Sequence, residues 1–279
     1  MKRRGPGVRT PRSTQISRYG FIVLLVVFSL MPFYWLILSA FDTKPQLWLT
    51  PVEFTFQNFV TFFVQEQGLL WTLNSLIYAV GTVAVVLFAS TLGGYMLSRL
   101  KFWWKTPFLY FIILIRVIPG TTYIVPLFKL IVNLGLMDTY WAVILVDAAG
   151  SIPIALWVMK TFFDTIQPEL EEAVWIDGGT RWTSLVRVVF PLSAPAAAAV
   201  AILTFRGSWG TFLTPVLFIS SPSKLPLGVA IFRAYITSQY IDYGFLAALA
   251  IVYIVPIIAL VLYSRRHLIR SFNLAGVTG

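Results

Sequence analysis

The chain has 279 residues, of which 58% are hydrophobic and only 11% are charged, whereas a soluble domain carries about 25% charged residues. These values exclude an ordinary soluble domain, and the apolar runs lack the alternating polarity of a membrane barrel. The sequence therefore predicts an all-α polytopic membrane protein. Its net charge of +10 is explained better by membrane orientation than by nucleic-acid binding, which we do not expect.

The N-terminus predicts a cytoplasmic arm followed by a first membrane span. Residues 1–18 hold six basic and no acidic residues, which indicates a polar, disordered arm. The apolar run at 19–41 is longer than a signal-peptide core and lacks a convincing cleavage site. It is long enough to cross a bilayer, so we interpret it as a retained span.

Five further spans are expected. They lie at 71–98, 107–131, 140–160, 194–219 and 243–263. Pro119, Gly120 and Pro126 interrupt the third span. The resulting six-span domain covers 19–263, with a long inner loop at 161–193, an outer segment at 220–242 and a cytoplasmic tail at 264–279.

Basic residues predict the orientation of this domain. Fifteen lie in segments assigned to the inside, against three outside (Lys44, Lys224 and Arg233) and three within spans. This bias predicts six spans with both termini in the cytoplasm and a surrounding of membrane lipid. No soluble domain remains for a nucleotide-binding fold, and no GxxxxGK phosphate loop occurs. The absence of cysteine and the single His267 argue against a metal site.

The inner loop is the one acidic segment on the cytoplasmic side, with five acidic and two basic residues in 161–193. Pro168 suits the first position of a helix, and the glutamates that follow favour the positive end of its dipole. Asp177-Gly178-Gly179 predicts a turn, and Thr180 predicts the cap of a second helix at 181–190. The loop is either a docking surface or a helical hairpin that only joins two spans.

Five loop residues resemble a known motif. They are Glu172, Ala173, Asp177, Gly178 and Pro191. Their spacing is similar to the EAA motif in permease subunits of bacterial ABC importers, with Val174 in place of the second alanine and Gly179 in place of a common alanine. In that family the motif begins a coupling helix that docks on the ATPase.

Other segments resemble the carbohydrate branch, the maltose-type permeases, over roughly 33–279. The similar segments are 73–75, Tyr95, 99–102, Pro119, 126–128 and 134–136. Three segments depart from that branch. Trp103-Trp104 replaces a short turn, Gly210 follows Trp209 where asparagine is usual, and the C-terminal tail lacks the family's lysine.

The resemblance implies a transport subunit, not an enzyme, in a bacterial inner membrane. Its expected partners are a second permease, two ATPase subunits docking on 168–190, and an external solute-binding protein. ATP and magnesium would bind the ATPase, and this chain would bind no cofactor. The implied cargo is a sugar or oligosaccharide, with glycerol phosphate or a peptide as alternatives.

Two other classes of protein fit the sequence less well. A self-contained secondary carrier predicts inverted repeats, and no clear repeat is visible. A membrane enzyme would need catalytic residues, and none form a convincing pair.

Charged residues within spans are candidates for a translocation pathway because burying charge in a bilayer is costly. Arg116, Asp147 and Arg206 are either pathway groups or members of structural pairs, whereas Lys129 is close enough to the surface to extend into it. A polar stripe on the fifth span either binds sugar hydroxyls or packs against another helix. The stripe consists of Thr204, Ser208, Thr211 and Pro215, beside Gly207.

Overall fold

The computed structural model describes residues 12–45, 53–237 and 242–275. Within these ranges the chain is mainly helical, and its strand-type pairing is limited to one isolated bridge between Asp42 and Phe54. The predicted all-α membrane fold is confirmed.

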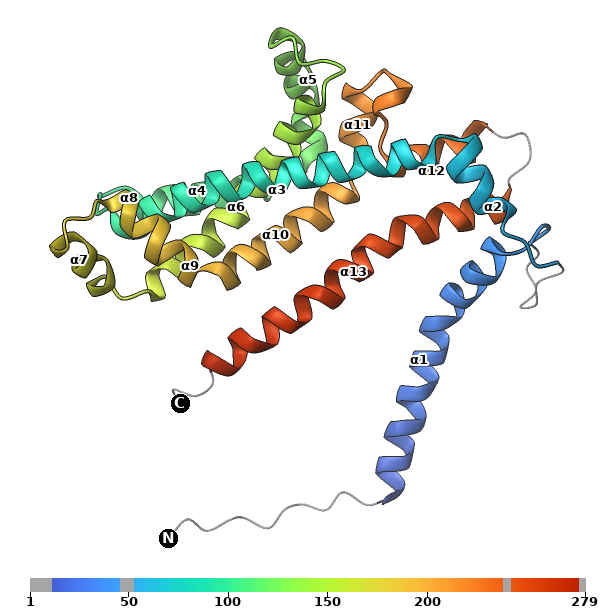
Figure 1. The fold of residues 1–279 in the computed structure, drawn as a ribbon, viewed down its shortest axis with the longest axis horizontal. Helices are drawn as coiled ribbons and strands as arrows, with labels where there is room; N and C mark the ends of the chain where they lie inside the picture. The colour runs from blue at the N-terminus through green and yellow to red at the C-terminus, as the bar shows by residue number, and fades with distance from the viewer. Residues whose placement is uncertain (1–11, 46–52, 238–241, 276–279) are drawn as a thin grey trace.

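Five helices dominate the fold (Figure 1). They are α1 (Arg12–Ala40), α3 (Gly68–Arg99), α6 (Tyr140–Thr165), α10 (Ala194–Trp209) and α13 (Tyr243–Ala275). Shorter helices connect them. They are α2 (Gln57–Val60), η1 (Thr61–Gln65), α4 (Lys105–Ile115), η2 (Gly120–Tyr123), α5 (Ile124–Asn133), α7 (Glu169–Ile176), α8 (Arg181–Ser184), η3 (Leu185–Val189), α9 (Phe190–Leu192), α11 (Leu213–Phe218), η4 (Pro222–Lys224) and α12 (Leu227–Thr237).

Four helices in the described ranges are long and apolar enough to cross a membrane, and two bent pairs raise the number to six. One pair joins Lys105–Ile115 to Gly120–Asn133 at 91°. The other joins Arg181–Leu192 to Ala194–Trp209 at 74°. The second pair therefore combines an inner-loop helix with the first part of the predicted fifth span.

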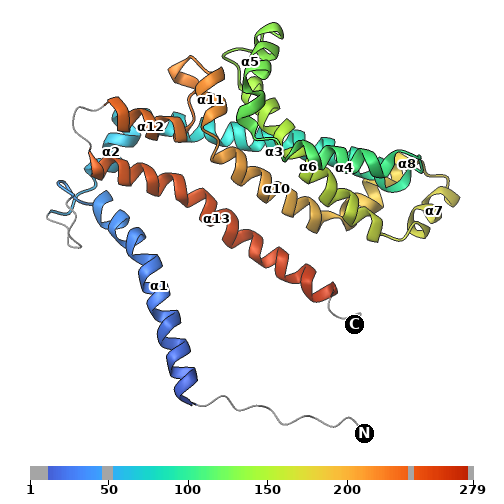
Figure 2. The same cartoon turned by 180° about the vertical axis from the view of Figure 1, so that it is seen from behind.

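The bundle has two distinct ends (Figures 1 and 2). Helices α3, α6 and α10 lie side by side, with α7, α8 and α9 at one end and α11 and α12 at the other. Helix α1 contacts α13 near the α12 end and diverges from the bundle beyond it. Its apolar surface is almost entirely exposed, as expected for a helix that contacts lipid or another chain.

The main hydrophobic core lies where α3, α6 and α10 meet. Val86, Ala148, Met159 and Val200 are buried there. A Cβ on Gly94 would lie only 3.0 Å from the backbone nitrogen of Lys160, so glycine permits the close approach of α3 and α6. Close van der Waals packing of these groups, which small residues permit, holds the three helices together.

Several expected boundaries are wrong. The helix of the fifth span ends at Trp209, and a short helix follows it after a break at Gly210. The outer segment contains α12. The last helix continues to Ala275, although its apolar span covers Tyr243–Tyr263, as predicted. The first helix begins at Arg12, so part of the predicted disordered arm is helical, while residues 1–11 lie outside the described residues. Polar residues continue these helices because helical hydrogen bonding does not require an apolar side chain.

Candidate functional site

Helix α7 has the local features that the sequence predicts. It begins directly after Pro168 and has acidic residues in its first turn. It ends before Gly178, whose φ of +81° is a left-handed conformation that glycine adopts without strain. The Thr180 hydroxyl then accepts a hydrogen bond from the backbone N–H of Thr183 at 3.2 Å. The predicted cap of the second inner helix is thus confirmed.

The second inner helix, α8 through α9, is anchored in the bundle. Leu185 and Val189 are buried in the same cluster as Met159 and Phe163 of α6. These buried apolar residues pack η3 against α6.

All five residues of the motif in the inner loop are solvent-exposed. They are Glu172, Ala173, Asp177, Gly178 and Pro191. The neighbouring Ile176 is 85% exposed. The motif is therefore accessible to another protein, and its role as a docking surface remains a prediction.

Glu171, directly before the motif, lies on the opposite side of α7 and is buried. Its carboxylate accepts hydrogen bonds from the Tyr95 hydroxyl and from Arg99 Nε, each at 2.5 Å. Arg99 also donates to the carbonyl oxygens of Phe163 at 3.1 Å and Ile166 at 3.0 Å. We call these five residues the Arg99 network.

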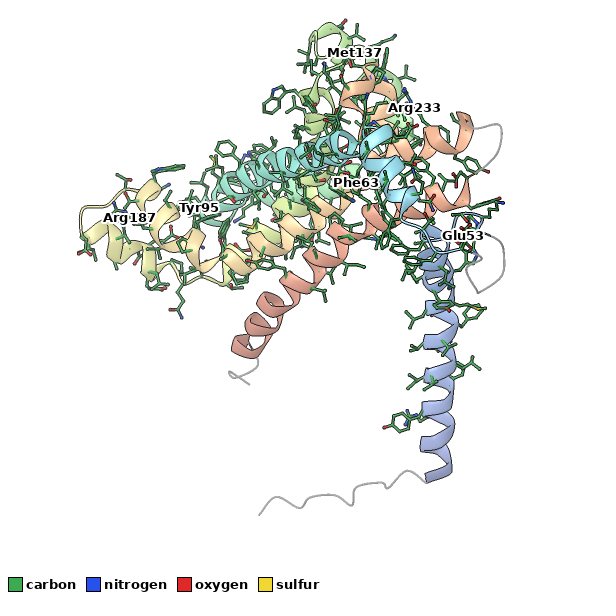
Figure 3. All side chains as sticks on the ribbon, turned by 45° about the vertical axis from the view of Figure 1, so that its right-hand side comes forward. Glu53, Phe63, Tyr95, Met137, Arg187 and Arg233 are labelled. Carbon is green, nitrogen blue, oxygen red and sulfur yellow. The ribbon has the colours of Figure 1, made fainter. Side chains whose placement is uncertain are left out.

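The Arg99 network joins three elements. Its member Tyr95 is labelled in Figure 3 and lies at the same end of the bundle as Arg187. Arg99 ends α3, its guanidinium satisfies terminal carbonyls of α6, and Glu171 belongs to α7. The Glu171 side chain is 1% exposed and that of Arg99 is 17% exposed. Breaking a buried pair by removing one partner costs about 3–5 kcal/mol, so α7 is held firmly against α3.

Sequence reasoning missed this network. It gave Glu171 only as one of the glutamates after Pro168, and Arg99 only as part of the segment 99–102. The two residues are 72 positions apart, and nothing in the spacing of either segment indicates that they meet.

Asp147 lies beside the break between α10 and α11. Its carboxylate accepts hydrogen bonds from Ser208 at 3.1 Å, Thr211 at 3.3 Å and Thr214 at 3.0 Å. The Ser208 hydroxyl in turn accepts a hydrogen bond from the Thr82 hydroxyl of α3, with the two oxygens 3.1 Å apart. The carboxylate therefore connects α6 to both sides of the break.

The polar stripe of the fifth span faces inward. Thr204 and Ser208 are 5% exposed, and Pro215 is buried as well. Thr211 is partly exposed beside Asp147. The structure thus places Ser208 and Thr211 together with Asp147, between packed helices.

The two arginines of this region lie apart from Asp147. Arg116 is exposed and donates to the Gly150 carbonyl at 2.7 Å. Arg206 is exposed in the last turn of α10. Among the described residues, neither forms an ion pair.

The model of the family described as binding-protein-dependent transport system inner membrane component matches residues 86–273. The chain belongs to that family. The matched region contains the motif, Arg99 and Asp147.

Relatives of the permease match over nearly their whole length. The arabinooligosaccharides transport system permease protein AraQ of Halalkalibacterium halodurans is 32% identical, with 94% of both chains covered. The sulfoquinovosyl glycerol transport system permease protein SmoH of Agrobacterium fabrum is 28% identical, with 98% of both chains covered. The trehalose/maltose transport system permease protein MalG of Thermococcus litoralis is 27% identical, with 92% of the permease and 94% of MalG covered.

The fold of the permease is also similar to that of a solved transporter. A chain of a bacterial ABC transporter involved in the import of the acidic polysaccharide alginate aligns with a TM-score of 0.82 at 20% identity. The alignment covers 94% of the permease and 99% of that chain. At this identity the likeness establishes the fold.

Proposed function

We propose that the permease is the membrane subunit of an ATP-driven importer for a sugar or oligosaccharide. The saccharide names of AraQ, MalG and the alginate transporter support this cargo class. The observation that carries the proposal is helix α7, which exposes the motif on one side and is fixed to α3 on the other by Glu171. A helix with these two faces is suited to transmit force from a docked protein.

In the proposed mechanism the ATPase docks on residues 168–190 and binds ATP with magnesium. Its closure moves α7 together with α8, η3 and α9. The Arg99 network passes the movement to α3 and α6, and buried Leu185 and Val189 pass it to α10. The spans then alternate between inward-open and outward-open arrangements.

The proposal requires further partners. A half-open cavity of about 190 Å³ lies between α6 and α10, below the 300–1,000 Å³ typical of ligand pockets. A second permease would complete the pathway along the exposed faces of this chain. An external binding protein would deliver cargo to the end that contains α11 and α12. In this arrangement both termini lie in the cytoplasm of a bacterial cell.

Replacing Gly178 by valine tests the docking role of α7. A β-branched residue is strained at a φ of +81°, and a Cβ there meets no atom within 4 Å, so the change affects the turn and its surface only. In proteoliposomes containing the assembled importer, we expect Gly178→Val to lower ATP-dependent uptake at least about tenfold, a loss of 1.4 kcal/mol or more in coupling. Membrane insertion should not change.

The matched control is Gly178→Asn, because asparagine tolerates the left-handed conformation better. It should retain more uptake than Gly178→Val. Normal uptake by the valine variant would contradict the docking role. Uptake by the permease alone, without ATP or partners, would instead support a self-contained carrier.

A further inference from the structure

The cavity between α6 and α10 has a cationic wall at mid-membrane depth. Arg116, Ser151 and Thr204 supply its polar lining, and apolar residues of α6 and α10 supply the rest. Arg116 donates to the carbonyl of Gly150, close to the middle of the 26-residue helix α6. The cavity therefore lies far from both membrane surfaces.

Most hydrogen-bonding capacity of this wall is unused within the described chain. A guanidinium has five N–H donors, and the one contact of Arg116 is to Gly150. The Thr204 hydroxyl has no hydrogen bond among the described residues, although its side chain is 5% exposed. A planar cation beside a free hydroxyl suits a carboxylate attached to a polyhydroxylated ligand.

A second cation lies at nearly the same depth. Arg206 is two residues beyond Thr204, which is about 3 Å along the helix axis. It shares an exposed face of α10 with Leu203, Gly207 and Gly210, and the space around Gly207 is open. Arg206 thus presents a second cation at this depth, on a side of α10 turned about 200° from Thr204 and outside the cavity lining.

No acidic group in the described part of the chain neutralises these arginines. Asp147 is the nearby carboxylate, and three hydroxyl groups already donate to it. An unpaired charge inside a bilayer is unfavourable. The region consequently requires an anion from outside this chain.

We propose that Arg116 forms a subsite for the anionic group of the cargo, such as a carboxylate or a sulfonate on a saccharide. This inference rests on the proposed function and names the charge of its substrate. Cargo is favoured over an acidic side chain of the second permease, because a saccharide carries hydroxyl groups beside its charge and these match the Ser151 and Thr204 hydroxyls beside Arg116.

Thiol labelling measures the charge of this cavity directly. The chain contains no cysteine, so Ser151→Cys introduces a single thiol on the cavity wall. The assembled importer, held in lipid nanodiscs, is treated with an anionic or a cationic methanethiosulfonate, and labelling of this chain is followed by mass. Relative to free cysteine, we expect the anionic reagent to react about tenfold faster than the cationic one, because one cation raises the local potential.

Arg116→Gln should remove this preference in the Ser151→Cys background, and Arg116→Lys should keep it because the charge remains. An excess of glucuronate should slow labelling more than the same excess of glucose. Equal reactivity of the two reagents, as an acidic side chain from the second permease would produce, overturns the proposal. Equal protection by glucose overturns it too.

Thr204→Cys, on the opposite wall, provides the same readout if Ser151→Cys does not assemble. The assay does not depend on transport. An importer that labels as expected but takes up no saccharide would therefore contradict the proposed function and leave the anion subsite intact. Saccharide uptake without a charge preference in labelling would contradict the anion subsite and leave the proposed function intact.

Discussion

At the scale of single residues, Glu171 and Glu172 are neighbours with opposite environments. Glu172 is exposed, while Glu171 is buried against Tyr95 and Arg99. A helix turns by about 100° per residue, so adjacent side chains necessarily point in different directions. One residue of the pair is available to a partner, and the other positions the helix.

Replacing Glu171 by glutamine should separate ATP hydrolysis from transport. The change leaves the buried part of Arg99 without its counter-charge, so α7 loses its fixed position on α3. We expect uptake per ATP hydrolysed to fall at least about tenfold, while the ATPase still co-purifies with the permease. The measurement compares uptake with phosphate release in proteoliposomes.

Two variants make this prediction specific. Glu169→Gln removes the same charge from the exposed first turn of α7 and should leave the ratio unchanged. Arg99→Lys keeps the charge but loses the planar group that contacts Phe163 and Ile166, so an intermediate ratio is expected. If Glu171→Gln couples normally, Glu171 has no positioning role.

At the scale of elements, Asp138 joins the turn before α6 to the segment after α11. Its carboxylate accepts hydrogen bonds from the backbone N–H groups of Ser220 and Ser221, at 3.1 and 3.0 Å, and from the Ser221 hydroxyl. Its backbone carbonyl accepts a hydrogen bond from Lys224. The hydroxyl of Ser221, followed by these other donors, holds the pKa of Asp138 well below its ordinary value.

The lowered pKa predicts an acid-sensitive contact between these elements. A carboxylate whose folded-state pKa is lowered stabilises the protein above its ordinary pKa of 3.8, and this contribution disappears as pH falls toward the folded-state pKa. Asp138→Asn should therefore lower the melting temperature at neutral pH. The difference from wild type should shrink progressively below about pH 4.

Asparagine is the appropriate replacement because Asp138 has a φ of +57°, which asparagine also tolerates. Thermal unfolding in detergent at several pH values provides the measurement. A difference in melting temperature that stays constant down to strongly acid pH would show that the carboxylate charge is unimportant for this contact.

At the scale of the whole molecule, the two ends of the bundle have different roles in the proposed importer. One end presents α7 to the ATPase, and the other presents α11 and α12 to the outside. This arrangement predicts the side on which each exposed loop can be labelled.

The orientation can be measured with single cysteines. In right-side-out vesicles, a membrane-impermeant maleimide should label Lys44→Cys, which follows α1, and should not label Lys101→Cys, between α3 and α4. Both positions are exposed in the structure, so burial does not bias the comparison. The opposite labelling pattern would place the termini outside and α7 away from a cytoplasmic ATPase.

The sequence by itself determined the features that depend on neighbouring residues. Apolar runs indicated most of the spans, Thr180 indicated a cap, and Gly178 indicated a left-handed turn. These features are local because hydrophobic length, capping and backbone conformation involve residues a few positions apart. Pro119 and Gly120 likewise indicated an interruption of the third span.

Only the tertiary structure decided the angle of that interruption and the contacts between distant segments. Neighbouring helices determine how far α4 and α5 bend from each other, which is 91° here. Glu171 meets Arg99 across 72 positions, and Asp147 meets Ser208 across 61. These pairs depend on how α3, α6, α7 and α10 pack together, and the spacing of residues along one segment contains no information about its neighbour in space.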